Sequence, residues 1–278
     1  MRQYTREGVG STSDEIRRLR EENVRLENRL AAFERSRWWR LHPRLTLERA
    51  LRRRGSGITI ATASSSAGHI AQADPVVERF RVEVVARGTF TKDWFTGSIP
   101  GWHPFVAELE HRKTRLLEIG SFEGLATCYL LWRLADAQLT CIDTFVGSPE
   151  HEHLEIDDSH LEATFDRNVT LIDASRVRKI VGDSKRALLE LIAEGASFEF
   201  VYIDGSHAGL DVIVDAALAW QLLAKRGVLV FDDYTWAVLG ADPLVRPGPA
   251  IDAFLQLVEG KHDIVLSGHQ LGLRKTSG

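Results

Sequence analysis

The chain has 278 residues, 44% of them hydrophobic and 27% charged, with a formal net charge of −4 and only two cysteines. The length can hold one large α/β domain and an appendage, or two small domains, the composition is close to that of globular proteins, and two cysteines argue against a disulfide-stapled fold. The slightly acidic balance argues against a nucleic-acid partner, and the sequence has neither an apolar leader nor the roughly 20 apolar residues of a membrane span, so we expect a cytoplasmic protein.

The first predicted element is a helix within residues 1–36. Thr12 followed three residues later by Glu15 is typical of a capping box. The positions after it follow the spacing of a short coiled-coil seam and are Ile16, Leu19, Asn23, Leu26, Leu30 and Phe33. We expect this segment to support a dimer or a larger homo-oligomer. The alternative is an amphipathic helix that lies on its own domain.

Residues 37–88 are expected to be a basic segment and a linker. The first part is rich in arginine and includes the run Arg52, Arg53, Arg54. Such a run is usually a solvated face, and a specific anionic partner is the alternative. Residues 55–74 are rich in Gly, Ser and Ala and have few large apolar groups, as linkers do. The folded domain is therefore assigned to residues 89–278.

Within this domain, apolar segments of strand length alternate with helical patterns. The expected strands are 115–119, 138–143, 178–181, 198–203, 227–232, 262–266 and 270–274. The expected helices are 123–134, 159–169, 185–194, 209–225 and 248–259. Strands separated by helices of this length imply parallel βαβ units. The predicted fold class is α/β, with a doubly wound, mostly parallel, seven-stranded Rossmann-like sheet.

The first strand ends in a glycine-bearing turn before a helix, with the sequence LLEIGSFEG at 116–124. Such a turn at the carboxyl edge of a sheet is typical of a nucleotide-type cofactor site. Phe122 stands where dinucleotide binders have a second glycine, so a pyrophosphate would approach poorly. A cofactor with one nucleoside and a cationic sulfonium needs no such approach. The candidate contacts are Glu118, which would help hold an ammonium group, and Gly120, Ser121 and Gly124.

The next two strands end in further candidate cofactor contacts. Asp143 lies 23 positions after Gly120, a spacing that lets an acid at the neighbouring strand tip accept both ribose hydroxyls. Asp183 and Ser184 follow the third strand and are expected to face the adenine amino group. Each acid taken alone is also compatible with an ordinary N-cap of the next helix.

Three aspartates follow the fourth and fifth strands, namely Asp204, Asp232 and Asp233. Parallel strands bring their carboxyl ends to the same crevice, where three carboxylates repel one another unless protons or a cation offset the charge. A hard divalent ion with oxygen ligands, such as Mg²⁺, removes this conflict. The alternative is that Asp232 or Asp233 caps the following loop and that no metal binds there.

His207 lies three positions after Asp204 and is the candidate general base. An imidazole has an unperturbed pKa of about 6.5, which suits proton transfer near neutral pH. The alternative is a structural histidine that bonds a neighbouring backbone group. The loop 146–158 contains further histidines, His151 and His153, as other candidates for the base.

These motifs amount to a resemblance to a known family. From about residue 89 to 275 the chain resembles the class I S-adenosylmethionine-dependent methyltransferases, and in particular the branch of macrocin-type sugar O-methyltransferases and cephalosporin-hydroxylase-like proteins. The matching pieces are LLEIGSFEGLAT, CIDTF, VGDS, YIDGSHAGLDVIVDAALAWQLLAKRGVLVFDDY and HQLGLRK. The resemblance implies an antiparallel last strand, bound S-adenosylmethionine and a divalent metal at Asp204, Asp232 and Asp233. Ser206 and His207 depart from the residues of the macrolide-sugar enzymes, which leaves the base open.

The sequence therefore predicts an O-methyltransferase that acts on a sugar hydroxyl of a glycoside, oligosaccharide or polysaccharide. Asp204 would serve as a cofactor contact, a metal ligand and a catalytic residue beside His207. One alternative is the methylation of a catechol-type phenol, whose neighbouring hydroxyls would use the same metal. Another is a catalytically silent dimeric scaffold in polysaccharide assembly, which has no need of three convergent aspartates.

Overall fold

The computed structural model describes residues 74–147, 158–236 and 243–276. The chain divides into two units, Met1–Gly68 and His69–Gly278, and every described residue belongs to the second. The expected coiled coil of 1–36, the arginine-rich segment and the loop residues His151 and His153 lie outside the described residues. Within the described ranges, no helix is long and apolar enough to cross a membrane.

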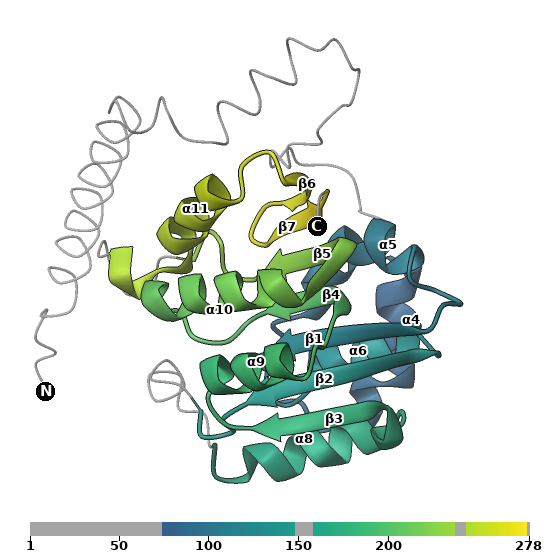
Figure 1. The fold of residues 1–278 in the computed structure, drawn as a ribbon. Coiled ribbons are helices and arrows are strands. Elements are labelled where there is room, and N and C mark those ends of the chain that lie inside the picture. Colours follow the sequence, from purple (N-terminus) through teal and green to yellow (C-terminus); the bar gives the residue numbers. More distant parts are fainter. Residues whose placement is uncertain (1–73, 148–157, 237–242, 277–278) are drawn as a thin grey trace, which may run out of the picture. The chain divides into compact units, whose positions relative to one another are not determined.

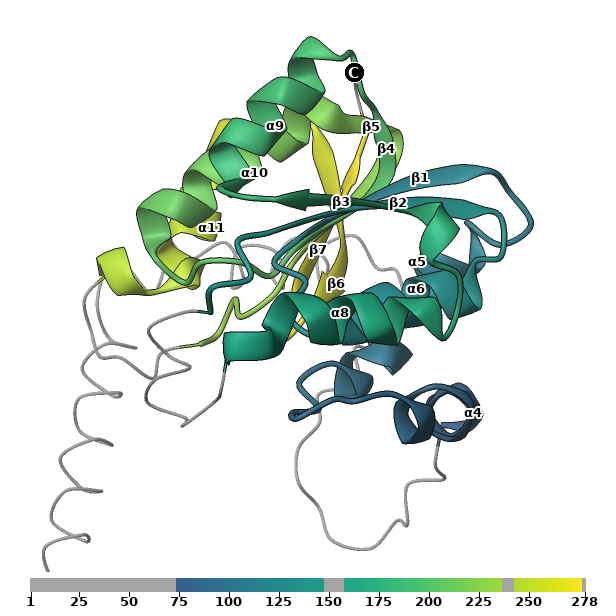
Figure 2. The same ribbon diagram turned by 90° about the horizontal axis from the view of Figure 1, so that it is seen from below.

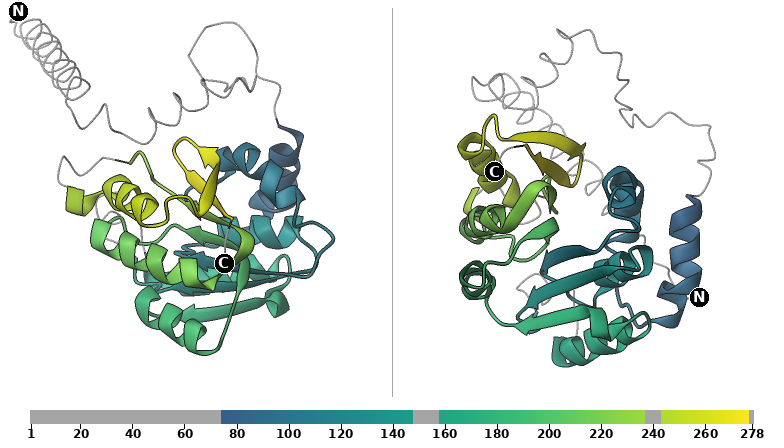
Figure 3. Two further views of the ribbon diagram at one scale, coloured as in Figure 1. Left: turned by 45° about the horizontal axis from the view of Figure 1, so that its top comes forward. Right: turned by 45° about the vertical axis from the view of Figure 1, so that its right-hand side comes forward.

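The described residues form one seven-stranded sheet in the order β3-β2-β1-β4-β5-β7-β6. The strands are β1 Thr114–Ile119, β2 Ala137–Asp143, β3 Val177–Val181, β4 Phe198–Ile203, β5 Leu223–Phe231, β6 His262–Ser267 and β7 Leu271–Lys275. Strands β1 to β5 pair in parallel, whereas β7 is antiparallel to both β5 and β6 (Figure 1). Figure 3 shows β6 and β7 together beyond β5 at one end of the sheet. This topology confirms the predicted doubly wound sheet and its antiparallel last strand.

Helices cover both faces of the sheet, as Figure 2 shows. One face carries α4 Pro75–Glu83, α5 Ile99–Ala107, α6 Leu125–Arg133 and α8 Leu161–Thr170. The other face carries α9 Ser184–Ala193, α10 Gly209–Leu222 and α11 Pro247–Leu257. Each layer packs on its own apolar core, because alternate strand residues point to opposite faces. Leu116 of β1 joins the first core and Leu117 the second.

The compact part begins before residue 89, the boundary expected from the sequence. In α4, Phe80 is fully buried in the first core, together with Val77 and with Val84 just after the helix. Asp74 caps the helix by accepting hydrogen bonds from the backbone N–H groups of Val76 and Val77, and Pro75 occupies the first helical position. The segment looked like linker because these few apolar residues stand among charged ones.

The junction of α10 and β5 also differs from the expectation of a helix to residue 225. The helix ends at Leu222 and the strand starts at once with Leu223. The apolar run at this point fits either element, so its composition alone does not fix the boundary. Arg226 has a left-handed backbone (φ 64°), and the pairing with β4 shifts its register there.

Candidate functional site

The carboxyl ends of β1 to β5 lie at one edge of the sheet because these strands are parallel, and the residue after each of three strands extends the sheet's hydrogen bonding. The N–H of Gly120 donates to Ile142 O at 2.9 Å, and the N–H of Asp204 donates to Ile119 O at 2.8 Å. The N–H of Asp232 likewise donates to Ile203 O at 2.9 Å. These bonds hold the first residues after β1, β4 and β5 in line. A small pocket at this edge is lined by residues that include Asp204, His207, Asp232 and Asp233.

The turn after β1 requires glycine at its start. Gly120 has φ 82°, and a Cβ on it would lie 2.0 Å from the backbone oxygen of Asp204. Gly124 also has a left-handed backbone (φ 81°) and immediately precedes α6. The backbone of the turn can therefore approach β4 more closely than any side chain would allow.

Asp143, the predicted ribose ligand, is bonded to this turn. Its Oδ2 accepts hydrogen bonds from the N–H groups of Ser121 at 2.7 Å and Phe122 at 2.9 Å. Its Oδ1 accepts one from the N–H of Phe145 at 2.7 Å. The carboxylate thus fixes the loops after β1 and β2 to each other at the predicted cofactor edge. Any ribose contact would share a carboxylate that already supports the turn.

Glu118 lies beneath the turn and is 1% exposed. Its Oε2 accepts hydrogen bonds from Ser121 Oγ at 2.7 Å and from Thr127 Oγ1. Its Oε1 is buried and has no hydrogen-bond partner among the described residues. Burial raises the pKa of Glu118 to about 7, against the effect of the hydroxyl donors. This environment makes Glu118 a support of the turn and does not favour its direct contact with an ammonium group.

The two residues predicted to face adenine bond to helices α9 and α10. Asp183 caps α9 by accepting a hydrogen bond from the N–H of Arg186 at 3.2 Å, as the simpler interpretation expected. Ser184 donates its hydroxyl to Asp215 Oδ1 of α10 at 2.8 Å. Burial raises the pKa of Asp215 to about 6. Both residues still begin the helix that follows β3 at the carboxyl edge.

Asp204 and Asp232 face each other across the hydroxyl of Tyr202. This hydroxyl lies 2.9 Å from Asp204 Oδ2 and also contacts Asp232 Oδ2. A phenol has one proton, so the second contact requires a proton on one of the carboxyl groups. Burial, followed by the charge of neighbouring aspartates, raises the pKa values of both Asp204 and Asp232. The predicted repulsion between convergent carboxylates is therefore present in the structure.

Asp233 lies between two imidazoles. His207 Nε2 is 2.7 Å from its Oδ2, and His269 Nε2 is 3.0 Å from its Oδ1. The His207 ring also stacks on Trp236, with centroids 4.4 Å apart. Asp233 adopts a left-handed backbone (φ 53°), a conformation that costs free energy in a non-glycine residue and recurs at functional sites.

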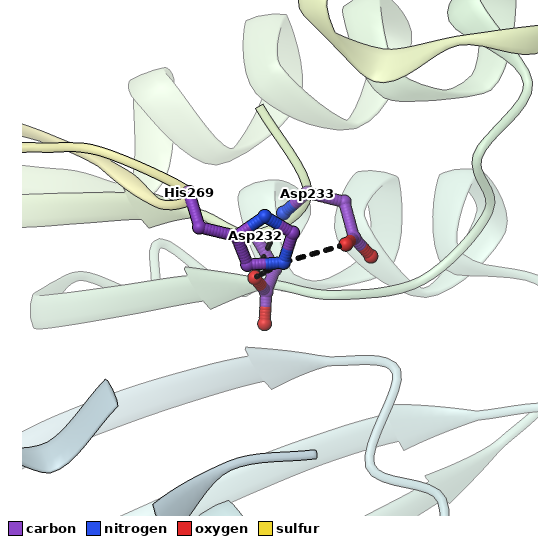
Figure 4. A group of neighbouring side chains, drawn as sticks. All are labelled: Asp232, Asp233 and His269. Carbon is purple, nitrogen blue, oxygen red and sulfur yellow. Dashed lines mark hydrogen bonds and ion pairs between the residues drawn. The ribbon is translucent and has the colours of Figure 1, made fainter. Parts of the chain in front are cut away.

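The closest group of possible metal ligands differs from the predicted set. Ligand atoms of Asp232, Asp233 and His269 all lie within 4.8 Å of one another (Figure 4). Asp204 is outside this close group and is linked to it through the Tyr202 hydroxyl. Sequence reasoning thus brought Asp204, Asp232, Asp233 and His207 to one edge and missed His269.

Three further residues at the edge were also missed. Tyr202 bonds the two buried acids, and Gln270 donates its side-chain amide to Asp232 Oδ2 at 3.2 Å. Fully buried Trp102 in turn donates to Gln270 Oε1 at 2.6 Å. Of these three residues, the sequence pattern could have indicated Gln270 alone, as a polar residue directly before Leu271 of the last strand.

A larger cavity of about 350 Å³ lies elsewhere, at the amino ends of β1, β2 and β3 beside the end of α9. Its lining includes Arg115 and Thr140 and none of the predicted site residues. Two charged groups of this lining already neutralise each other, since Arg178 bonds Glu194 at 2.6 Å and 2.7 Å. In open α/β sheets ligands bind at the carboxyl ends of the strands, so the small pocket is the better candidate.

Comparisons with known proteins agree with this geometry. Residues 117–234 match the model of a family described as a methyltransferase domain. A comparison with curated protein sequences gave no match. Among solved structures, the chain is similar to the MycE methyltransferase from the mycinamycin biosynthetic pathway, in complex with Mg, SAH and mycinamycin VI. That similarity has 18% identity and a TM-score of 0.51, and it covers 73% of this chain and 54% of MycE.

A second similar structure is an O-methyltransferase from Bacillus cereus in complex with SAH, at 16% identity and a TM-score of 0.50. The match covers 74% of this chain and 93% of that one. The chain therefore spans about half the length of MycE but nearly all of the smaller enzyme. At these identities the two likenesses show a shared fold. Together, the strand order, the turn after β1 and these likenesses show that the chain has the class I, S-adenosylmethionine-dependent methyltransferase fold, with a match to a methyltransferase-domain family over residues 117–234.

Proposed function

We propose that the chain transfers the methyl group of S-adenosylmethionine to a sugar hydroxyl of a glycoside, oligosaccharide or polysaccharide, with the help of a divalent cation. The observation that carries the proposal is the gathering of Asp204, Asp232 and Asp233 beside His207, at the sheet edge that also has the glycine turn. MycE supports it, since that methyltransferase is described in complex with Mg, SAH and mycinamycin VI.

The methyl donor would lie against the turn after β1. Gly120 starts the turn without a side chain, because a Cβ there would meet the backbone of Asp204. Ser121 and Gly124 form the rest of the turn and are the other candidate contacts of the donor. Asp143 supports the turn from below and is the candidate for the ribose hydroxyls, with Asp183 and Ser184 toward the base. Glu118 contributes by holding Ser121. The sulfonium of the donor supplies an activated methyl group.

The acidic group fits a divalent cation. Burial raises the pKa of both Asp204 and Asp232; the charge of Asp232 raises the pKa of Asp204 further, and the charge of Asp233 raises that of Asp232. The single proton of the Tyr202 hydroxyl does not compensate two carboxylates. A bound cation of charge +2 would offset this repulsion. Asp232 and Asp233 would hold it directly, with Asp204 next to them. When bound, such an ion lowers the pKa of a hydroxyl group and can orient two neighbouring oxygens.

His207 is the proposed acceptor of the hydroxyl proton. Its Nδ1 is buried, so Nε2 is the ring nitrogen that faces the crevice. Asp233 lies 2.7 Å from this nitrogen. Before transfer the ring would carry its proton on Nδ1 and leave Nε2 unprotonated; Nε2 would then take the hydroxyl proton, and Asp233 would stabilise the imidazolium that forms. The stack on Trp236 restricts the ring further. Because the methyl group is already activated, the chain would need only to align the acceptor oxygen with it and to remove the proton of the acceptor hydroxyl.

A transfer assay with a deuterated methyl donor tests this function. Glycosides and catechols are offered in parallel, and products are read by mass spectrometry. Label on glycosides, lost in Asp232→Asn, is the expected result. Label confined to catechols would replace the sugar by a phenol as the acceptor. No label on either panel, with the donor bound, would favour the scaffold interpretation.

Two further predictions belong to this proposal. The N-terminal coiled coil would hold the chain as a dimer or larger homo-oligomer, and the protein would act in the cytoplasm. Light scattering of the full chain at micromolar concentration tests the first, and a monomer would contradict it. Fractionation of the producing cells tests the second.

A further inference from the structure

His269 lies between β6 and β7, at the tip of the hairpin that ends the sheet, and faces the acid pair. Its Nε2 is 3.0 Å from Asp233 Oδ1 and 3.8 Å from Asp232 Oδ1 (Figure 4). One imidazole nitrogen and two carboxylate oxygens therefore converge from two segments far apart in the sequence. This convergence was invisible to the sequence pattern that pointed to the three aspartates.

The far side of the His269 ring is also held. Its Nδ1 lies 3.2 Å from the hydroxyl of Thr235, and the N–H of Tyr234 donates to the backbone oxygen of His269 at 2.8 Å. The next residue, Gln270, bonds Asp232 Oδ2. Metal-binding histidines commonly have their second nitrogen fixed by a hydrogen bond, which sets the tautomer and the ring orientation. The hairpin is thus attached to the loop after β5 in a way that points Nε2 at the carboxylates.

We propose that His269 is a ligand of the cation, together with Asp232 and Asp233, so that the site binds a transition-metal dication such as Mn²⁺ in preference to Mg²⁺. The inference rests on the proposed function, because it concerns the cation of the same site. Mg²⁺ prefers oxygen ligands and gives up its water reluctantly, whereas imidazole nitrogen is a ligand for transition metals. Asp204 remains an outer partner linked by the Tyr202 hydroxyl.

The simpler alternative is an ion pair between a protonated His269 and Asp233. The His269 side chain is 58% exposed, and exposed pairs contribute little to stability. The two interpretations predict opposite effects. A protonated imidazole competes with any cation, so its removal would strengthen the binding of Mg²⁺ and Mn²⁺ alike. Removal of a ligand would weaken the binding of Mn²⁺ and affect Mg²⁺ little.

The test titrates the metal-free full chain with Mn²⁺ and with Mg²⁺ in a calorimeter, for wild type and His269→Gln. We expect His269→Gln to weaken Mn²⁺ binding by about tenfold or more and Mg²⁺ binding by less than about threefold. His111→Gln is the matched control, because His111 is an exposed histidine just before β1, at the opposite edge of the sheet. His269→Glu replaces the nitrogen by an oxygen ligand and is expected to raise the affinity for Mg²⁺.

A pulsed electron paramagnetic resonance spectrum of bound Mn²⁺ gives an independent measure. We expect a ¹⁴N coupling in wild type and in His207→Gln and its loss in His269→Gln. An unchanged ¹⁴N signal in His269→Gln, or tighter binding of both metals, would overturn the inference. Methyl transfer that ignores chelation would refute the proposed function while leaving this ligand set intact. Metal-dependent transfer without a ¹⁴N coupling would refute the ligand set alone.

Discussion

The buried carboxyl group of Glu118 makes a quantitative prediction about stability. Burial raises its pKa from 4.5 to about 7. The folded chain therefore holds this proton more tightly than the unfolded chain does. Stability from this group is fully present below pH 4.5 and is lost as the pH rises to about 7. At about 1.4 kcal/mol for each pH unit, the loss amounts to roughly 3 kcal/mol.

Glu118→Gln isolates this contribution, because the amide has nearly the same shape and does not ionise. At low pH the variant should be about as stable as the wild type, since the protonated carboxyl and the amide are both neutral. Above pH 7 the variant should be more stable by roughly 3 kcal/mol. Titrating groups that the charge of Glu118 does not influence, such as Asp215, act equally in both proteins and cancel in the difference.

Urea denaturation at several pH values between 4.5 and 8 measures the effect. With a slope of about 2 kcal/mol per molar urea, the midpoint of the variant should exceed that of wild type by roughly 1 to 2 M at pH 8. The difference should vanish at the acid end. A difference that does not change with pH would refute the account of Glu118 as a buried carboxyl group with one uncompensated oxygen.

The remaining predictions concern the turn after β1. Gly120→Ala should destabilise the domain far more than Gly195→Ala. Both glycines have a left-handed backbone, but only a Cβ on Gly120 would meet the backbone oxygen of Asp204. Equal melting temperatures of the two variants would contradict this close approach. Asp143→Ala should weaken S-adenosylmethionine binding in calorimetry by about 1.5–3 kcal/mol, since three backbone N–H groups lose their charged acceptor. Asp173→Ala, which removes the side chain that caps the short helix before β3, is the control and should leave the affinity unchanged; an unchanged affinity in Asp143→Ala would refute the role of Asp143.

The sequence was sufficient for the central strands of the sheet because they are buried on both faces. Runs such as that of β4, with Phe200 and Val201 in opposite cores, are nearly continuous apolar stretches, as expected for strands of a parallel sheet that is covered on both faces. The spacing of the helices between them then implies parallel pairing. The start of the domain was harder to predict, because α4 depends on a single large apolar side chain, Phe80. The burial of Phe80 in the first core is apparent only from the folded structure.

Only those site residues that directly follow a predicted strand could be predicted from the sequence. The positions of Asp204, Asp232 and His207 follow from parallel topology, and these residues do line one pocket. The role of Asp143 as an acceptor for backbone N–H groups depends on the path of the turn, which composition does not specify. His269 reaches the site through the antiparallel pairing of β7 with β5. The residues next to His269 in the sequence do not indicate this contact, because it depends on how the β6–β7 hairpin pairs with β5.

In the proposed function, the acid group at the carboxyl edge serves methyl transfer through a divalent cation. The most direct test measures transfer from labelled S-adenosylmethionine to a glycoside before and after treatment of the full chain with EDTA. We expect transfer to fall by at least about a hundredfold and to return with added Mn²⁺ or Mg²⁺, while the affinity for S-adenosylmethionine stays unchanged. Undiminished transfer by the metal-free chain would contradict this proposal, and proton removal would then depend on His207 without a cation.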